Sequence, residues 1–216
     1  VALKLEGKDA NAPMLEHEVN IMRLLTNPVM PQGFANVFYY GTDGAFSVAA
    51  MDLLGASLEY LTYQRGGRLS VTTTVLVAEQ GLQRLQWLHS KGIVHRDLKG
   101  ENFLFGVGGK IHHLYLIDFG LSKFYYDFPG ERHYAFRQKL SLTGTARYAS
   151  INAHKGMEQS RRDDLEAFGH VLLQHARGSL PWSGLDARTK AEKYRKICEK
   201  KEQTPLPDLC RGLPEQ

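Results

Sequence analysis

Cysteine is scarce in this sequence, because Cys198 and Cys210 are the only two among 216 residues. Two thiols can form neither a disulfide framework nor a four-cysteine zinc site, which is typical of a protein from a reducing compartment. The sequence also lacks an apolar run of the ~18 residues that cross a membrane, since Ser47 and Asp52 interrupt the nearest candidate, residues 45–54. No secretory signal peptide is visible. We therefore expect a cytoplasmic or nuclear protein with no membrane partner.

Neither sign of charge is in large excess. Lys and Arg number 27 and Asp and Glu number 23, so the formal net charge is +4 with neutral histidines. The two signs are interleaved, which argues against a nucleic-acid-binding arm, and no nucleic-acid partner is expected. Hydrophobic residues make up 43% and charged residues 23%, which excludes disordered and fibrous classes. The length suits one domain, or one domain in two lobes.

The first 52 residues are predicted to form strands around one helix, because β-branched runs alternate with turn residues and one stretch has helical periodicity. Glycines within residues 41–44 predict a hairpin turn, since glycine tolerates the positive φ of a tight turn. The expected elements are a strand over 1–5, a helix between Pro13 and Pro28, and strands over 36–40 and 45–51.

From residue 53 onward the periodicity is mainly helical. Ser70 is a good N-cap for a helix whose apolar stripe is predicted to include Val71, Val75, Leu82 and Leu85. A second helix, from 163 or 164 to 176, reads as buried nearly all round, and a basic helix is expected over 189–201. Residues from about 120 to 152 show no periodicity, and a loop of that length is rare unless it has a function.

The change of periodicity predicts the domain organisation. We expect an α+β fold in two lobes, with a small β-rich lobe over residues 1–52 and a larger, mostly helical lobe over residues 53–216. Residue 1 is Val rather than Met and lies in a predicted strand. We therefore expect residues 1–216 to be one domain that is truncated at both ends.

Residues 95–102, His-Arg-Asp-Leu-Lys-Gly-Glu-Asn, carry the chemistry of the sequence. Asp118-Phe119-Gly120 begins 16 residues after Asn102. Together the two motifs supply a carboxylate to orient a hydroxyl, oxygen ligands for hard cations, and a lysine to neutralise phosphoryl charge, which is the set that phosphoryl transfer requires. In this order and at this spacing they form the catalytic signature of protein kinases.

A lysine and a glutamate upstream complete the pattern. Val1-Ala2-Leu3-Lys4 matches the kinase strand whose lysine binds the α- and β-phosphates of ATP. Glu18, in the predicted helix that follows, is the expected partner of Lys4. Glu16 competes for this role, but it lies two positions away and so points elsewhere on the helix.

The segment 142–152, Leu-Thr-Gly-Thr-Ala-Arg-Tyr-Ala-Ser-Ile-Asn, is the most distinctive one. Most protein kinases have Ala-Pro-Glu where this chain has Ser150-Ile151-Asn152, whereas casein kinase I enzymes have Ser-Ile-Asn. Residues 158–166 and 178–182 match the same family. The chain therefore resembles a casein kinase I family Ser/Thr protein kinase over essentially all of its 216 residues. The tau-tubulin and vaccinia-related kinases share fewer of these motif residues and remain an alternative.

The resemblance implies roles for the residues of the two motifs. Asp97 would orient the substrate hydroxyl and accept its proton, and Lys99 would neutralise the charge of the transferred phosphoryl group. Asn102 and Asp118 would hold Mg²⁺. Asp164 would brace the catalytic loop by bonding its backbone.

The resemblance also implies an ATP site. Lys4, tethered by Glu18, would bind the phosphates, and Met51 stands at the gatekeeper position. Asp52 and Leu54 would offer backbone groups to the adenine edge, while three apolar side chains would sandwich the ring. The full set is Ala2, Lys4, Glu18, Met51, Asp52, Leu54, Leu104, Ile117 and Asp118.

Three basic residues, Lys139, Arg147 and Lys193, fall where this family collects an anion. Family members prefer protein substrates that are already phosphorylated, or acidic, three residues before the target Ser or Thr. An arginine with two lysines is a sensible receptor for a phosphate, which carries nearly two charges. The resemblance further implies a monomer that is active without phosphorylation of its own loop.

Two departures from the family pattern stand out. Gly100-Glu101 replaces the usual Pro-Asp pair after Lys99, and the glycine is expected to loosen the loop. The glycine-rich loop that roofs the ATP site in this family would precede Val1, so the given residues are expected to be poorly active alone. A pseudokinase or interaction scaffold is therefore the alternative from another functional class.

Overall fold

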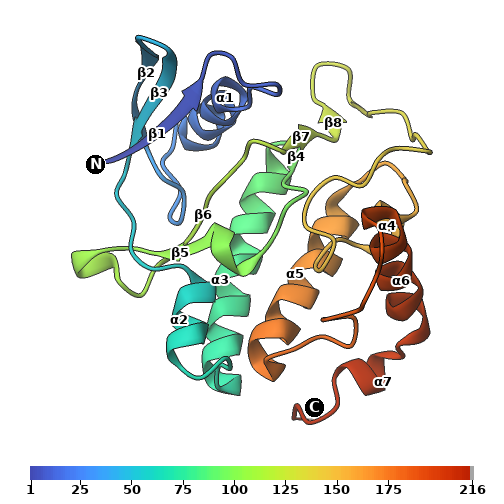
Figure 1. The fold of residues 1–216 in the computed structure, drawn as a ribbon. Coiled ribbons are helices and arrows are strands. Elements are labelled where there is room, and N and C mark those ends of the chain that lie inside the picture. The colour runs from blue at the N-terminus through green and yellow to red at the C-terminus, as the bar shows by residue number, and fades with distance from the viewer. Residues whose placement is uncertain (215–216) are drawn as a thin grey trace.

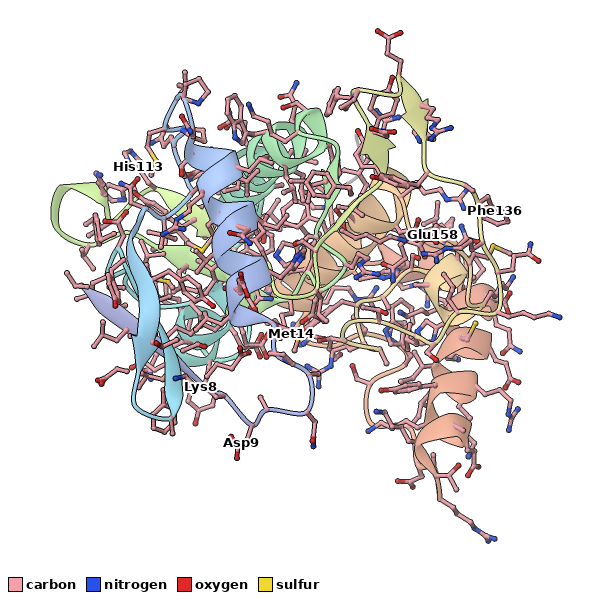
Figure 2. All side chains as sticks on the ribbon, turned by 90° about the horizontal axis from the view of Figure 1, so that it is seen from above. Lys8, Asp9, Met14, His113, Phe136 and Glu158 are labelled. Atoms are coloured by element: carbon pink, nitrogen blue, oxygen red, sulfur yellow. The ribbon has the colours of Figure 1, made fainter. Side chains whose placement is uncertain are left out.

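The computed structural model describes residues 1–214, and a small β-rich part stands on a larger helical part (Figure 1). The small part is an antiparallel sheet in the order β1-β3-β2, with one helix packed against it. The loop with Lys8 and Asp9 lies at its edge (Figure 2). Its elements are β1 (Ala2–Gly7), α1 (Leu15–Thr26), β2 (Val37–Asp43) and β3 (Phe46–Met51). The α+β character and the arrangement of a β-rich and a helical part are as expected.

The hairpin between β2 and β3 is tighter than predicted. Asp43 pairs with Phe46, so the turn consists of Gly44 and one further residue, and residues 41–43 belong to β2. Gly44 adopts φ +53°, the conformation a two-residue turn requires. Gly41 is a residue of β2. A side chain would not fit at this position, because the Tyr39 side chain folds across Gly41 and occupies the space of a Cβ.

The larger part is built on two long helices, α3 and α5, which pack against each other. The residues of the two motifs lie between these helices, mostly in loops that join short strands, with Gly100–Asn102 in a 3₁₀ turn. Its elements are α2 (Leu58–Gln64), α3 (Val71–Ser90), β4 (Ile93–Val94), η1 (Gly100–Asn102), β5 (Phe103–Phe105), η2 (Gly108–Lys110), β6 (Leu114–Leu116), β7 (Lys123–Phe124), β8 (Tyr126–Asp127), β9 (Arg132–His133), α4 (Ile151–His154), α5 (Arg161–Arg177), α6 (Lys190–Gln203) and α7 (Leu206–Leu209).

The buried face of α3 differs from the predicted stripe. Ser70 caps the helix as expected, and Leu85 is buried, but Val71, Val75 and Leu82 are exposed. The packing partner selects the face, because the Phe168 ring of α5 lies against Gly81, where a Cβ would clash. Apolar residues lie on two faces of α3, and periodicity alone cannot tell which one meets α5.

Three other predictions need correction. Leu165 of α5 is 47% exposed, so this helix is not buried all round. The helix α2, capped by Ser57, was not predicted, because seven residues are too few to show a period. Short strands β7, β8 and β9 lie in the segment 120–152, where two-residue strands leave no pattern in the sequence. Among residues 1–214, no helix combines the length and the apolar character needed to cross a bilayer.

Candidate active site

The loop 95–102 is held at its start by one carboxylate from α5. Asp164 accepts hydrogen bonds from the backbone N–H groups of His95 (2.8 Å) and Arg96 (2.9 Å). The imidazole of His95 is fully buried, and its Nε2 lies 3.0 Å from the carbonyl oxygen of Ile117. Arg96 adopts φ +71°, which is unfavourable for a residue with a Cβ, and these bonds hold it there. The expected brace by Asp164 is thus seen in the structure.

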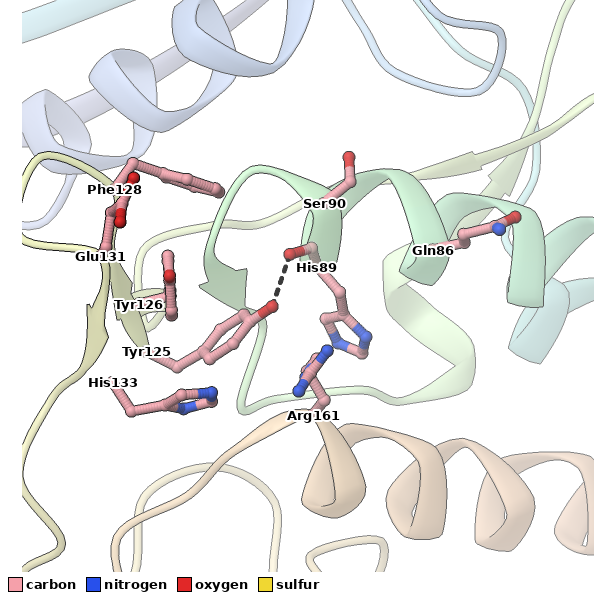
Figure 3. A pocket seen from close by; sticks show the side chains of 9 residues that line it. All are labelled: Gln86, His89, Ser90, Tyr125, Tyr126, Phe128, Glu131, His133 and Arg161. Carbon is pink, nitrogen blue, oxygen red and sulfur yellow. Dashed lines mark hydrogen bonds between the residues drawn. The ribbon is translucent and has the colours of Figure 1, made fainter.

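The same carboxylate also contacts His89, a residue that lines a groove. The Nε2 of His89 lies 2.9 Å from Asp164 Oδ2. The groove has a volume of about 750 Å³, and the Tyr125 hydroxyl donates to the His89 carbonyl at 2.7 Å. Figure 3 shows His89 and Tyr125 among its lining residues. The Arg161 guanidinium stands 5.0 Å from the centroid of the Tyr125 ring. The brace is therefore connected through His89 to the groove.

Asp97 is oriented by three hydrogen bonds. Its Oδ2 accepts from Lys99 Nζ at 2.9 Å, and its Oδ1 accepts from the backbone N–H and the hydroxyl of Thr145 at 2.8 and 2.7 Å. Burial would raise the pKa of Asp97, but the bonds from Lys99 and Thr145 outweigh it and hold the pKa below its ordinary value. The carboxylate is therefore ionised and fixed, as a group that orients a hydroxyl must be.

Asn102 and Asp118 can supply oxygen ligands to a hard cation. Asn102 uses its Nδ2 to donate to the Asp97 carbonyl at 2.9 Å, which leaves its side-chain oxygen available. Asp118 adopts φ +68°, and its side chain is 38% exposed. No group of three or more His, Cys, Asp or Glu side chains within residues 1–214 is arranged as a metal site. One carboxylate and one amide suit Mg²⁺, which takes few protein ligands and completes its shell with phosphates and water.

Lys4 and Glu18 form the ion pair expected from the sequence. Lys4 Nζ lies 2.6 Å from Glu18 Oε2 and 3.5 Å from Asp118 Oδ1. Burial lowers the pKa of Lys4, and the two carboxylates more than offset this, so its pKa is raised. Burial raises the pKa of Glu18 while Lys4 lowers it, and at 2.6 Å we take the pair as ionised at neutral pH. Glu16 is exposed and is not the partner.

A cleft of about 370 Å³ lies between the small and the large part. Its walls are mainly apolar, and Lys4, Glu18 and Asp118 cluster together among them, which suits a ligand that has a flat ring and an anionic tail. Three lining residues were not predicted: Met22, Ala35 and Leu53. The predicted residues that line it are Ala2, Lys4, Glu18, Met51, Asp52, Leu54, Asn102, Leu104, Ile117 and Asp118.

The backbone of Asp52 has only part of its hydrogen-bonding capacity available for such a ring. Its N–H donates to the Asn36 carbonyl at 3.1 Å, and its side chain accepts from the Asn36 N–H at 2.8 Å. The prediction that Asp52 offers backbone groups is therefore limited to its carbonyl. Leu54 makes no backbone hydrogen bond within residues 1–214, so both of its groups are available.

The three candidate anion-binding residues come from different segments, and all are exposed. The ammonium groups of Lys139 and Lys193 make no hydrogen bond or ion pair within the described part of the chain. Arg147 lies 5.7 Å from the centroid of the Tyr148 ring. The neighbouring Tyr148 side chain and the nearby charges of Glu59 and Glu101 raise the pKa of Arg147. The charge of Arg147 is therefore partly balanced before any ligand binds.

Two functional contacts were missed by the sequence reasoning. Thr145 was noted as part of a distinctive segment and as one of the hydroxyls in the loop that many kinases phosphorylate, and not as a partner of Asp97, although its hydroxyl and N–H both hold Asp97. Glu158, labelled in Figure 2, pairs with Lys123 and with Arg137, the latter at 2.7 Å, and so ties down the segment before Gly144. The sequence shows that Thr145 lies two residues before Arg147, but the direction in which the Thr145 side chain points depends on the fold.

A comparison with models of known protein families matches residues 4–210 to the protein kinase domain. The matched range begins at Lys4 and contains both motifs, with Asp97, Asn102 and Asp118. It spans most of the 216 residues. From the assembled site and this match together, the chain belongs to the protein kinase domain family.

Proposed function

We propose that this protein is a Ser/Thr protein kinase of the casein kinase I type, which transfers the γ-phosphoryl group of ATP to primed or acidic protein substrates. The observation that carries the proposal is the fixed carboxylate of Asp97, which stands with Lys99 beside a cleft that ends in Lys4 and Asp118. Protein kinase domains in general use ATP with Mg²⁺. A scaffold would need neither a fixed Asp97 nor the complete set of charged groups.

The cleft residues divide the work of binding ATP. Ala2, Leu104 and Ile117 would enclose the adenine ring, with Met51 as gatekeeper and the backbones of Asp52 and Leu54 at its edge. Lys4, held by Glu18, would bind the phosphates. Asn102 and Asp118 would hold Mg²⁺, which when bound neutralises the charge that develops on the phosphates.

Asp97 and Lys99 would act on the hydroxyl and on the transferred group. Asp97 orients the serine or threonine hydroxyl and accepts its proton as the oxygen attacks phosphorus. The Lys99 ammonium stands 2.9 Å from Asp97 Oδ2 and supplies positive charge where the phosphoryl group arrives. Positioning and charge are the main contributions that a protein makes to this reaction.

The preference for primed substrates is the finer part of the proposal. Arg147 with Lys139 and Lys193 would bind a phosphate or carboxylate three residues before the target. Its support is that both lysines are unpaired within residues 1–214 and that Arg147 is exposed. The loop is ordered without a phosphate of its own, because Leu140 N–H bonds the Gly156 carbonyl at 2.9 Å and Glu158 binds Arg137. We therefore propose activity without loop phosphorylation.

The test is a transfer assay of the full-length protein with labelled ATP and four peptides. The peptides carry Ser, Thr or Tyr as acceptor, and the Ser peptide is also made with phosphoserine three residues before the target. We expect transfer to Ser and Thr, none to Tyr, and at least ten-fold higher kcat/KM on the primed peptide, since a charge-assisted contact is worth about 1.5–3 kcal/mol. Transfer to Tyr alone would contradict the Ser/Thr assignment. ATP binding without transfer to any peptide would favour the scaffold.

A further inference from the structure

Gly100 is enclosed by two side chains from different helices. His175 of α5 and Glu59 of α2 both place an atom closer than 3.0 Å to the position that a Cβ on residue 100 would take. Real Cβ atoms do not approach other atoms so closely, so any larger residue here would displace His175 or Glu59. The expected loosening of the loop by Gly100 is therefore replaced by close packing against these two side chains.

The two atoms that face Gly100 have no other partner. His175 Nε2 and Glu59 Oε2 are both buried, and neither has a hydrogen bond within residues 1–214. They lie 3.6 Å apart, a few tenths of an ångström beyond a hydrogen bond. A buried polar atom without a partner costs about 1–3 kcal/mol, so each is the natural partner of the other.

Proton positions are compatible with a bond between them. Burial lowers the pKa of His175 to about 4, so the ring is neutral at pH 7 and carries one N–H. Thr62 Oγ1 lies 2.8 Å from both His175 Nδ1 and the Leu58 carbonyl oxygen, so its one hydroxyl proton can be donated to either of them. When the hydroxyl donates to Nδ1, the ring proton is on Nε2 and points to the Glu59 carboxylate. This arrangement leaves neither buried atom unpaired.

We propose that Glu59 and His175 are positioning residues, whose mutual hydrogen bond next to Gly100 holds the catalytic loop in the position that phosphoryl transfer requires. The inference rests on the proposed kinase function. Gly100 directly follows Lys99, and η1 packs against α2, so a shift at Gly100 moves Lys99 and Asn102. Neither member of the pair touches the reacting atoms.

The test compares two substitutions of Glu59 that both remove its charge. Glu59→Gln keeps an oxygen that accepts from His175 Nε2, whereas Glu59→Leu has a similar size and no hydrogen-bonding group. The Glu59 side chain is 40% exposed, so both variants are expected to fold. Two readouts are taken: amide hydrogen exchange of residues 97–102, and kcat with the KM for ATP. Gly100→Ala is compared with Gly109→Ala, where a Cβ meets nothing within 4 Å.

We expect Glu59→Gln to stay within two-fold of the unaltered protein in both readouts. Glu59→Leu should speed exchange of the loop amides and lower kcat by about ten-fold, which corresponds to one hydrogen bond, with little change in the KM for ATP. Gly100→Ala should act like Glu59→Leu, and Gly109→Ala should have no effect. Equal behaviour of the Gln and Leu variants would overturn the proposal. If no variant transfers phosphate, the kinase assignment fails, while the exchange data still decide whether the pair holds the loop.

Discussion

The catalytic loop and the candidate anion-binding surface are held in different ways. Asp97 is buried, and each oxygen of its carboxylate has a hydrogen-bond partner. Lys139 and Lys193 stand in solvent without a side-chain partner among residues 1–214. The difference fits their proposed tasks. A group that orients a reacting hydroxyl must be fixed beforehand, whereas a charge that captures an anion from solvent gains little from being buried.

The backbone next to Arg147, under the candidate anion-binding surface, is nevertheless firmly held. Lys201 of α6 is buried, and its ammonium donates to the carbonyls of Ala146, at 3.0 Å, and of Ala149. These carbonyls flank Arg147 on either side. Burial lowers the pKa of Lys201 to about 7. The candidate surface thus combines a backbone held by Lys201 with exposed basic side chains.

The largest effect is expected at the fixed carboxylates. Asp97→Asn and Asp118→Asn should each lower kcat by about 10²- to 10⁴-fold, since each removes a charge with a defined task. Asp118→Asn should also weaken binding of nucleotide in the presence of Mg²⁺. Steady-state kinetics and titration with a fluorescent nucleotide measure the two effects. Asp43→Asn, at the exposed end of β2, is the control, and near-normal kcat in Asp97→Asn would refute the assigned role.

Acid should lower the stability of the helical part that carries both regions. Burial lowers the pKa values of His154, His170 and His175 to about 4, below the ordinary 6.5. Between pH 6.5 and 4 the unfolded chain therefore binds more protons than the folded one, so stability falls as the pH falls through this window. We expect a loss of roughly 1–2 kcal/mol per histidine from pH 7 to 5, measured by urea unfolding. A flat profile would show that these rings are not buried in solution.

The third prediction tests whether Arg147 binds the priming phosphate of the substrate or instead supports the loop. Arg147→Ala should lower kcat/KM on the primed peptide by about ten-fold or more and change an unprimed, non-acidic peptide far less. A two-by-two comparison of protein and peptide measures this. Equal losses on both peptides would mean that Arg147 holds the loop through Tyr148 and does not read the phosphate.

A smaller effect is expected at Lys193. Lys193→Ala removes a hydrated, exposed charge, so we expect a loss of about two- to five-fold on the primed peptide, because exposed ion pairs are worth only ~1 kcal/mol. The matched control is Lys200→Ala, an exposed lysine further along the same helix. A ten-fold loss would show that Lys193 is as tightly engaged as Arg147.

The chemistry of the site was accessible from the sequence because it depends on residue types at fixed spacing. The two motifs predicted Asp97, Asn102 and Asp118. The structure brings Asn102 and Asp118 to one cleft with Lys4, and Asn102 bonds the backbone of Asp97. The choice of Glu18 over Glu16 followed from helix geometry and agrees with the ion pair. The anion-binding role of the basic residues stays a prediction, since it depends on a ligand.

Other features depended on contacts between distant segments, which no local pattern encodes. The buried face of α3 is decided by the Phe168 ring at Gly81, because both faces of this helix carry apolar residues. Thr145 becomes a partner of Asp97 only when a segment 48 residues away folds over the loop. Gly100, read from the sequence as a loosening residue, is packed by His175 and Glu59. The sequence by itself determined which groups are present and on which local element, while tertiary packing decided which of them meet and how firmly each is held.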